Sequence, residues 1–169
     1  MSLHTLYILV EGETEFAVVK SFLQPYWEQR FEKCQIINYK GNGNLKAKYV
    51  ERIGKILSKP DQAVLVLIDI KNDPFYVQDT ALSHEDAYQK LQQIMYAGLS
   101  MDESDNLGIF PVLVEVETWL LADPTIQRDY LRRQITHPEN EANPEVEIKR
   151  LVPNYRKGLS AKKYFDKAS

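Results

Sequence analysis

The feature that most constrains this fold is the run from Ala63 to Ile70, in which Asp69 is the only polar residue. A short apolar run rich in β-branched residues predicts a strand buried on both faces, as in the middle of a parallel sheet. Runs of similar composition predict three further strands, at Thr5–Val10, Cys34–Tyr39 and Ile109–Val116. Pro111 places the amino-terminal half of the last strand at a sheet edge or a bulge.

Helical patterns separate these strands. Apolar residues spaced three and four apart predict a helix after the first strand (Phe16, Val19, Phe22, Leu23, Tyr26) and another after the second (Tyr49, Val50, Ile53, Ile56, Leu57). Ser83 is the predicted N-cap of a third helix, and a fourth begins at Trp119 and resumes through Ile126 to Leu131. The alternation predicts an α/β fold, with a mostly parallel sheet and helices on both faces.

The length of 169 residues is that of about one domain. We expect an α/β domain over residues 1–136, followed by a loop and a basic helical tail over 137–169 that packs on the same domain. The stretch from His137 to Glu147 holds two prolines and several acids and amides, which predicts an exposed loop. The tail after it is the most basic part of the chain.

Composition excludes several classes of protein. No apolar run approaches the roughly 18 residues that a membrane span needs, and no signal peptide is recognisable at the first residues. Cys34 is the only cysteine, so an internal disulfide and a thiolate metal cluster are excluded, and we expect a cytoplasmic protein. The 21 basic and 24 acidic residues nearly balance, which argues against bulk electrostatic binding of nucleic acid but leaves room for a local basic groove.

Carboxylates follow three of the four predicted strands. Glu11 follows the first, Asp69 ends the central one with Asp73 four residues on, and Glu115 and Glu117 close the fourth. Parallel strands bring their carboxyl ends to one edge, where ligands bind in open α/β sheets. Crowded acids raise one another's pKa unless a cation neutralises them, and an all-oxygen site favours Mg²⁺ or Mn²⁺. The alternative is that these acids are solvated helix starts; acids after three separate strands favour the metal site.

The turn after the first strand reads Glu11-Gly12-Glu13-Thr14-Glu15. Gly12 permits a sharp turn or a positive φ, and Thr14 is a candidate N-cap. Glu11 would then be left to face the crevice at the sheet edge. The alternative is an ordinary connection between strand and helix with an acidic first turn.

These residues, together with Asp69 and the segment Glu115-Val116-Glu117-Thr118-Trp119-Leu120-Leu121-Ala122-Asp123, resemble TOPRIM-related proteins. The chain is most similar to the bacterial DUF4276 family, related in fold to the nuclease domains of OLD-type proteins. The resemblance spans nearly the whole chain. The turn at Gly41–Asn44 and the segment Tyr155-Arg156-Lys157 support it more weakly.

The resemblance implies roles for particular residues. Glu11 matches a glutamate that acts as general acid or base or as metal ligand, and Asp69 matches a catalytic aspartate that binds Mg²⁺. Glu117, with Trp119 and Asp123, matches the third element, although we expect Trp119 to pack against the core. A second aspartate is expected at position 71, where this chain has Lys71. Asp73 is then the substitute metal ligand, or Lys71 a phosphate contact.

Together these observations predict a Mg²⁺- or Mn²⁺-dependent nuclease or phosphoryl-transfer domain acting on nucleic acid, which the resemblance connects to defence against phage or mobile DNA. The expected metal ligands are Glu11, Asp69, Asp73 and Glu117. The expected backbone contacts are Lys71, Lys46, Lys48, Lys162 and Lys163. The alternative is a TOPRIM-like module without catalysis, which binds a nucleotide, a nucleic acid end or a partner protein such as an ATPase; Lys71 favours it.

Overall fold

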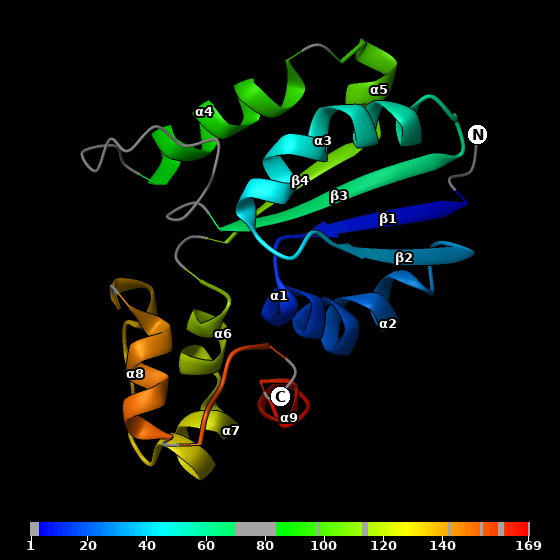
Figure 1. Ribbon diagram of the computed structural model, residues 1–169. Helices are drawn as coiled ribbons and strands as arrows, with labels where there is room; N and C mark the ends of the chain where they lie inside the picture. The colour runs from blue at the N-terminus through cyan, green and yellow to red at the C-terminus, as the bar shows by residue number, and fades with distance from the viewer. Residues whose placement is uncertain are drawn as a thin grey trace.

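The computed structural model describes residues 4–69, 84–97, 99–112, 115–141, 143–152, 154–158 and 161–168. Their strands form one parallel sheet in the order β2-β1-β3-β4 (Figure 1). The strands are β1 (Thr5–Val10), β2 (Lys33–Asn38), β3 (Gln62–Asp69) and β4 (Leu107–Val112). The α/β prediction is confirmed. The strand predicted to be central is β3, which pairs with β1 on one side and β4 on the other.

Helices cover both faces of this sheet. One face carries α3 (Asn42–Leu57), α4 (His84–Tyr96) and α5 (Met101–Asp105). The other carries α1 (Glu13–Val18), which runs through a π-helical segment (Val19–Leu23) into α2 (Gln24–Trp27). On that side lie also α6 (Glu117–Ala122), α7 (Pro124–Ile126), a second π-helical segment (Gln127–Leu131), a 3₁₀ turn (Pro138–Asn140), α8 (Pro144–Leu151) and α9 (Lys162–Phe165). Among the described helices, none combines the length and apolar character that a bilayer crossing requires.

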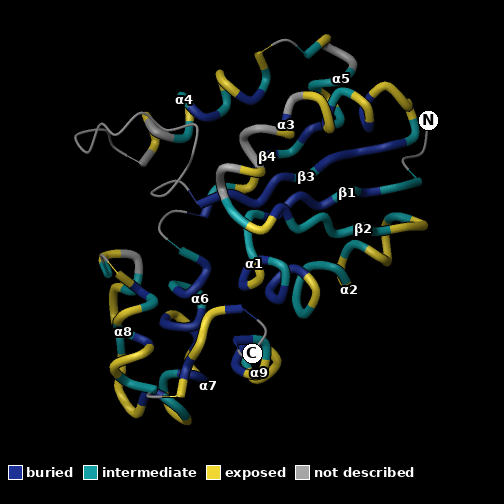
Figure 2. The backbone as a smooth tube through the Cα atoms, viewed as in Figure 1, coloured by how far each residue is buried: buried dark blue, intermediate teal, exposed yellow. Residues whose placement is uncertain are grey.

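The alternation of side chains along the strands divides the core in two. In β3, Val64, Val66 and Ile68 pack beneath α3 and α4, whereas Ala63 and Leu67 belong to the core on the opposite face. Figure 2 shows β3 buried along most of its length. Because side chains alternate with a period of two, Asp69 shares the side of Ala63 and Leu67. This is the side on which α1 and α6 lie.

The carboxyl-terminal segment is part of the same core. Tyr155, Tyr164 and Phe165 are buried and belong to the cluster that contains the inward side chains of β1. The backbone N–H of Gly158 donates a 2.9 Å hydrogen bond to Oγ1 of Thr14, which joins this segment to the first turn of α1. The segment is thereby fixed beside the carboxyl edge of the sheet.

Several local expectations about the strands and their turns differ from the structure. β4 begins two residues earlier than expected, and Glu117 is the first residue of α6 rather than a strand residue. Thr14 lies inside α1 and caps nothing; Gly12 holds the N-cap position in extended backbone, with φ −142°. A Cβ at Gly12 would lie 2.9 Å from the Glu15 carboxylate, so close packing, not positive φ, favours glycine there.

Three further expectations, which concern a turn, an apolar helix face and a loop, differ from the structure. The expected turn at Gly41–Asn44 contributes the first turn of α3, with Gly41 at φ 123° before it. Tyr26, placed by its spacing on an apolar face, is 51% exposed. The stretch His137–Glu147 is not an open loop throughout, because α8 begins at Pro144, which is buried. The expected cap Ser83 lies outside the described residues.

Candidate functional site

A cleft of about 350 Å³ lies at the carboxyl edge of the sheet. It is lined by the turn after β1, the end of β3 and the carboxyl-terminal segment: Glu11, Gly12, Glu13, Thr14, Glu15, Asp69, Lys157 and Gly158. Two of the expected site residues, Glu11 and Asp69, therefore meet in one cleft. The parallel strands bring them there, because β1 and β3 are neighbours and end at the same edge.

Asp69 is the most perturbed acid of the cleft. It is the last residue of β3, its side chain is buried, and its Oδ1 has no hydrogen-bond partner in the described part of the chain. Burial, together with the charges of Glu15, Glu11 and Glu117, raises the pKa of Asp69 to about 9. A carboxylate that is both desolvated and surrounded by other acids stays protonated at neutral pH unless a cation compensates it.

Glu117, the first residue of α6, is a second buried carboxyl group; it is not among the residues that line the cleft, but its charge acts on Asp69. Its Oε1 accepts a 3.0 Å hydrogen bond from the hydroxyl of Tyr155, while Oε2 has no partner among the described atoms. Burial raises the pKa of Glu117 to about 7, although the ammonium of Lys157 acts in the opposite direction. Since Glu117 also raises the pKa of Asp69, the two carboxyl groups interact electrostatically across the junction of β3 and α6.

Glu15 is a third buried acid, on the first turns of α1. Burial raises its pKa, and this outweighs the backbone hydrogen bonds and the Lys157 charge that act the other way. Glu11 is only partly buried and lies just before, at the end of β1. Glu11, Glu15 and Glu117 all act electrostatically on Asp69, so one partly buried acid and three buried ones lie near one another at this edge.

Lys157 supplies the positive charge of the site. Its Nζ lies 3.1 Å from Oε2 of Glu145 and 3.6 Å from Oε1 of Glu115. Burial disfavours its ammonium, but the charges of Glu117 and Glu115 and the bond to Glu145 outweigh burial and raise its pKa. The backbone N–H of Glu145 also donates to Glu115, at 3.3 Å. The lysine therefore joins α8 to the segment before α6 and neutralises part of the acidic cluster.

A known protein family matches nearly the whole of this chain. A family model described as "Domain of unknown function (DUF4276)" matches residues 10–169. The chain belongs to the DUF4276 family. The match begins before Glu11 and includes the carboxyl-terminal segment with Lys157, so both sides of the cleft lie within the DUF4276 region. No curated protein and no solved structure shows significant similarity to the chain.

The remaining expected residues of this DUF4276 domain are either outside the described part of the structure or away from the residues that line the cleft. Lys71 and Asp73 fall outside the described residues, as does the side chain of Lys46 on α3. Lys48 is exposed on α3. In the tail, Lys162 forms an ion pair with Asp166, and the ammonium of Lys163 lies 4.6 Å from the ring centroid of Tyr164.

The two other residues of the third sequence element have structural roles. Asp123 accepts a 2.9 Å hydrogen bond from the backbone N–H of Ile126 and so caps α7. The Trp119 ring packs edge-on against Phe110 of β4, with ring centroids 6.3 Å apart. The expectation that Trp119 packs rather than stacks on a base agrees with this contact.

Three residues of the site were not singled out in the sequence: Glu15, Tyr155 and Lys157. Glu15 follows Glu11 by four residues, but its burial depends on the turn at Gly12 and on the carboxyl-terminal segment. Tyr155 and Lys157 stand in the basic tail, more than 80 residues after Asp69, and no local pattern connects them to the sheet edge. Only the weak similarity of the segment Tyr155–Lys157 to the family pointed toward them.

No set of three His, Cys, Asp or Glu side chains among the described residues forms a ready metal-binding group. The acids of the DUF4276 cleft are instead near neighbours that perturb one another electrostatically. Such an arrangement can hold protons, transfer one to or from a bound group at the half-exposed Glu11, or accept a cation with a small number of protein ligands.

Proposed function

We propose that this protein is a Mg²⁺- or Mn²⁺-dependent phosphodiesterase that acts on nucleic acid at the carboxylate cleft. The observation that carries the proposal is the pair Asp69 and Glu117, two buried carboxyl groups that each have a raised pKa and an oxygen without a hydrogen-bond partner among the described residues. Buried acids of this kind destabilise the fold when ionised, which is a common property of functional sites.

The donor set fits a hard divalent cation. Among the described residues that line the cleft, the acidic side chains are Glu11, Glu13, Glu15 and Asp69, and none is a cysteine or histidine. Mg²⁺ commonly takes only one or two protein carboxylates and completes its coordination with water and phosphate oxygens. Asp69 and Glu117 would supply that number without a three-residue cage. When bound, the cation would polarise a phosphate oxygen and offset the charge that develops on it.

The side chains around this position have complementary tasks. Glu11 lines the cleft as a partly exposed residue whose Oε2 is buried, and we assign to it the exchange of a proton with an attacking or leaving oxygen. Tyr155 holds Glu117 through its hydroxyl. Lys157 keeps the acidic cluster from excessive repulsion through Glu115 and Glu145. These contacts would orient the carboxylates before a substrate arrives.

The resemblance to TOPRIM proteins supports the same reading. The resemblance implies functional roles for Glu11 and Asp69, and here Glu11 directly follows β1 while Asp69 ends β3, the strand that pairs with β1. The pattern further implies a role in defence against phage or mobile DNA, which we include in the proposal only as biological context.

A non-catalytic binding module is the second candidate, and Lys157 favours it. The lysine already neutralises part of the cluster through two carboxylates. With this internal cation, the cleft could bind a nucleotide, a nucleic acid end or a partner protein such as an ATPase without a metal. The two candidates differ in whether phosphodiester bonds are broken.

The decisive experiment is a cleavage assay on single- and double-stranded DNA and RNA, with Mg²⁺, Mn²⁺ or a chelator. The native protein should cleave at least one substrate with metal and none with chelator. Glu11→Gln should lose most of this activity, because the amide cannot exchange the proton. Glu32→Gln, an exposed acid beside His4 at the other edge of the sheet, is the matched control and should retain it. Binding without cleavage under all these conditions would favour the second candidate.

A further inference from the structure

A second cleft lies on the helical layer, away from the carboxylates. It has a volume of about 500 Å³ and is lined by Pro124, Gln127, Arg128, Arg132, Arg133 and Gln134. None of these residues lines the carboxylate cleft. In Figure 1, α6 leads away from the sheet edge to α7, where this arginine cleft begins.

The backbone of the arginine cleft is held in place by Gln127. Its Nε2 donates to the carbonyl oxygens of Leu121 and Ile135, at 2.6 and 3.0 Å, and its Oε1 accepts from the N–H of Ile135 at 3.2 Å. The N–H of Arg133 bonds to the carbonyl of Gln127, at 3.3 Å. The loop that carries the arginines is therefore fixed at both ends.

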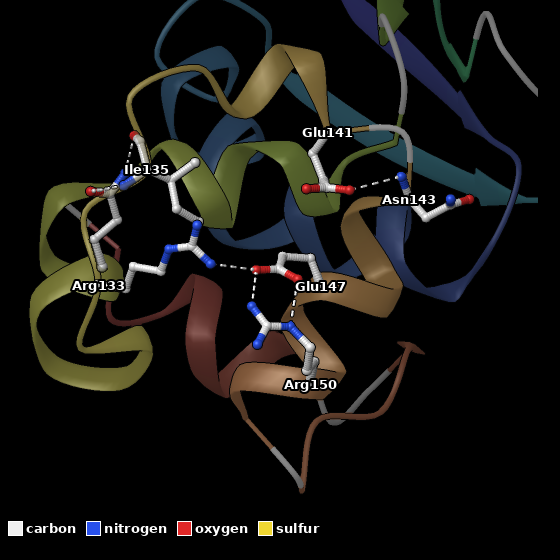
Figure 3. Close-up of polar contacts among 7 residues, drawn as sticks. Arg133, Ile135, Glu141, Asn143, Glu147 and Arg150 are labelled. Carbon is white, nitrogen blue, oxygen red and sulfur yellow. Dashed lines mark hydrogen bonds and ion pairs between the residues drawn. The ribbon is translucent and has the colours of Figure 1, made fainter.

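Two of its arginines already have acidic partners. Arg128 binds Asp129 through two hydrogen bonds, at 2.6 and 3.0 Å. Arg133 shares Glu147 with Arg150, as Figure 3 shows: Arg133 lies 3.2 Å from Oε1, and Arg150 binds both oxygens. Asp123 also acts electrostatically on Arg128, and Glu141 on Arg150, so each of these three arginines has acidic neighbours.

Arg132 differs from the other three. It is exposed and has left-handed backbone, with φ 51° and ψ 32°, at the end of the π-helical segment. Within the described residues its guanidinium makes neither a hydrogen bond nor an ion pair. Residues other than glycine are disfavoured in this left-handed conformation, so the arginine at this position lowers the stability of the turn. The cleft therefore combines fixed backbone with one uncompensated guanidinium.

We infer that the arginine cleft binds a backbone phosphate of nucleic acid, at a site separate from the carboxylates. One guanidinium group can bind two phosphate oxygens at once through two parallel N–H donors. Gln127 and Gln134 line the same cleft. The choice of nucleic acid rests on the proposed phosphodiesterase function, because a long polyanion can reach both clefts. The site would position the substrate and take no part in chemistry.

The test compares Arg132→Gly with the native protein in a fluorescence-anisotropy titration of labelled DNA and RNA oligonucleotides, in chelator and over a range of salt. Glycine adopts the left-handed backbone freely, so the variant should melt no lower than the native protein. Its affinity should fall about three- to tenfold, similarly for all sequences. The slope of log K against log salt should flatten by about 0.7 to 0.9.

Arg30→Gln removes the same charge from an exposed arginine that stacks on Tyr26 after α2, and should leave affinity and slope at native values. Equal weakening by both variants, or none by Arg132→Gly, would overturn the assignment. Competition by polyglutamate as strong as that by unlabelled nucleic acid would overturn it in favour of an acidic protein. Because the titration contains chelator, an absence of cleavage in the separate assay refutes the phosphodiesterase proposal without affecting this result.

Discussion

The hydroxyl of Tyr155 donates a 3.0 Å hydrogen bond to Oε1 of Glu117. Glu117 is fully buried. The two residues are 38 positions apart and join the carboxyl-terminal segment to the first residue of α6. The bond gives one carboxylate oxygen a donor, while the other is buried without a hydrogen-bond partner among the described residues. The tail is therefore part of the electrostatic balance of the cleft.

Removing this donor should destabilise the protein in a pH-dependent way. Tyr155→Phe should lower the free energy of unfolding by about 1–2 kcal/mol at pH 8, where Glu117, with a pKa of about 7, is mostly ionised. The loss should be smaller at pH 5, because a protonated carboxyl needs the donor less. Urea unfolding at the two pH values measures both. Tyr164→Phe is the matched control: its ring packs against Tyr155, and the described structure gives its hydroxyl no hydrogen bond. A pH-independent loss would contradict the assigned role.

Ionisation of Asp69 should make the metal-free protein less stable as pH rises. Its pKa is about 9 in the folded state and near 3.8 as an ordinary aspartate, so between these values the folded state holds more protons than the unfolded one. Stability must then fall with increasing pH across this window, with a slope of at most about 1.4 kcal/mol per pH unit from this group.

Asp69→Asn should remove that contribution. In chelator, the free energy of unfolding of the variant should fall less between pH 5 and pH 9 than that of the native protein. Asp105→Asn is the control: Asp105 is exposed just before β4, and its substitution should leave the native dependence of stability on pH unchanged. Urea unfolding at each pH provides the measurement. If the native and Asp69→Asn slopes coincide, Asp69 is not the buried acid that the geometry indicates.

The contact between Gly158 and the first turn of α1 should also be essential for stability. Gly158 has φ +79°, and a Cβ there would lie 3.2 Å from Cβ of Glu13. Gly158→Ala should therefore destabilise the protein by about 1–3 kcal/mol. Gly54→Ala is the contrasting control: Gly54 lies inside α3 with open space around it, so alanine should stabilise by about 0.5–1 kcal/mol. Thermal melting compares them, and a loss at Gly54 equal to that at Gly158 would argue against a specific clash.

The sequence predicted the sheet well because each strand carries its own signal. Ala63–Ile70 is apolar enough to require burial on both faces, and β3 is indeed an interior strand. Glu11 and Asp69 could be paired in advance because the carboxyl ends of parallel strands share an edge. Such inferences need only local composition and the rules of parallel sheets.

Contacts between distant segments could not be predicted in this way. Threonine is a residue type that favours the N-cap position, yet the Thr14 hydroxyl accepts a hydrogen bond from the backbone N–H of Gly158, 144 residues away. Lys157 looks like one basic residue among many in the tail, but Glu115 and Glu145 surround it. The partners of these residues depend on how the tail packs, and no periodicity in the chain encodes that packing.

The cation proposal leads to the sharpest test of the cleft. If Mg²⁺ or Mn²⁺ binds the folded state alone, it should raise the melting temperature by mass action. At about 100 times its Kd the gain is about 2.7 kcal/mol, which corresponds to roughly 5–10 °C for a domain of this size. The gain should be larger at pH 8 than at pH 6, because the metal competes with protons for Asp69, whose pKa is about 9.

Asp69→Asn should lose most of this gain, because the amide offers the cation a neutral and weaker ligand. Without metal, the variant should melt higher than the native protein at pH 8, since folding of the native protein must keep Asp69 protonated well above its ordinary pKa, and asparagine needs no proton. Asp105→Asn should respond to metal like the native protein, which separates the cleft from general surface binding. Scanning calorimetry with millimolar Mg²⁺, millimolar Mn²⁺ or chelator measures all three proteins. The cation site would be refuted if metal left the melting temperature of the native protein unchanged, or if it raised that of Asp69→Asn by the same amount. Either result would favour the metal-free binding module, in which Lys157 neutralises part of the acidic cluster.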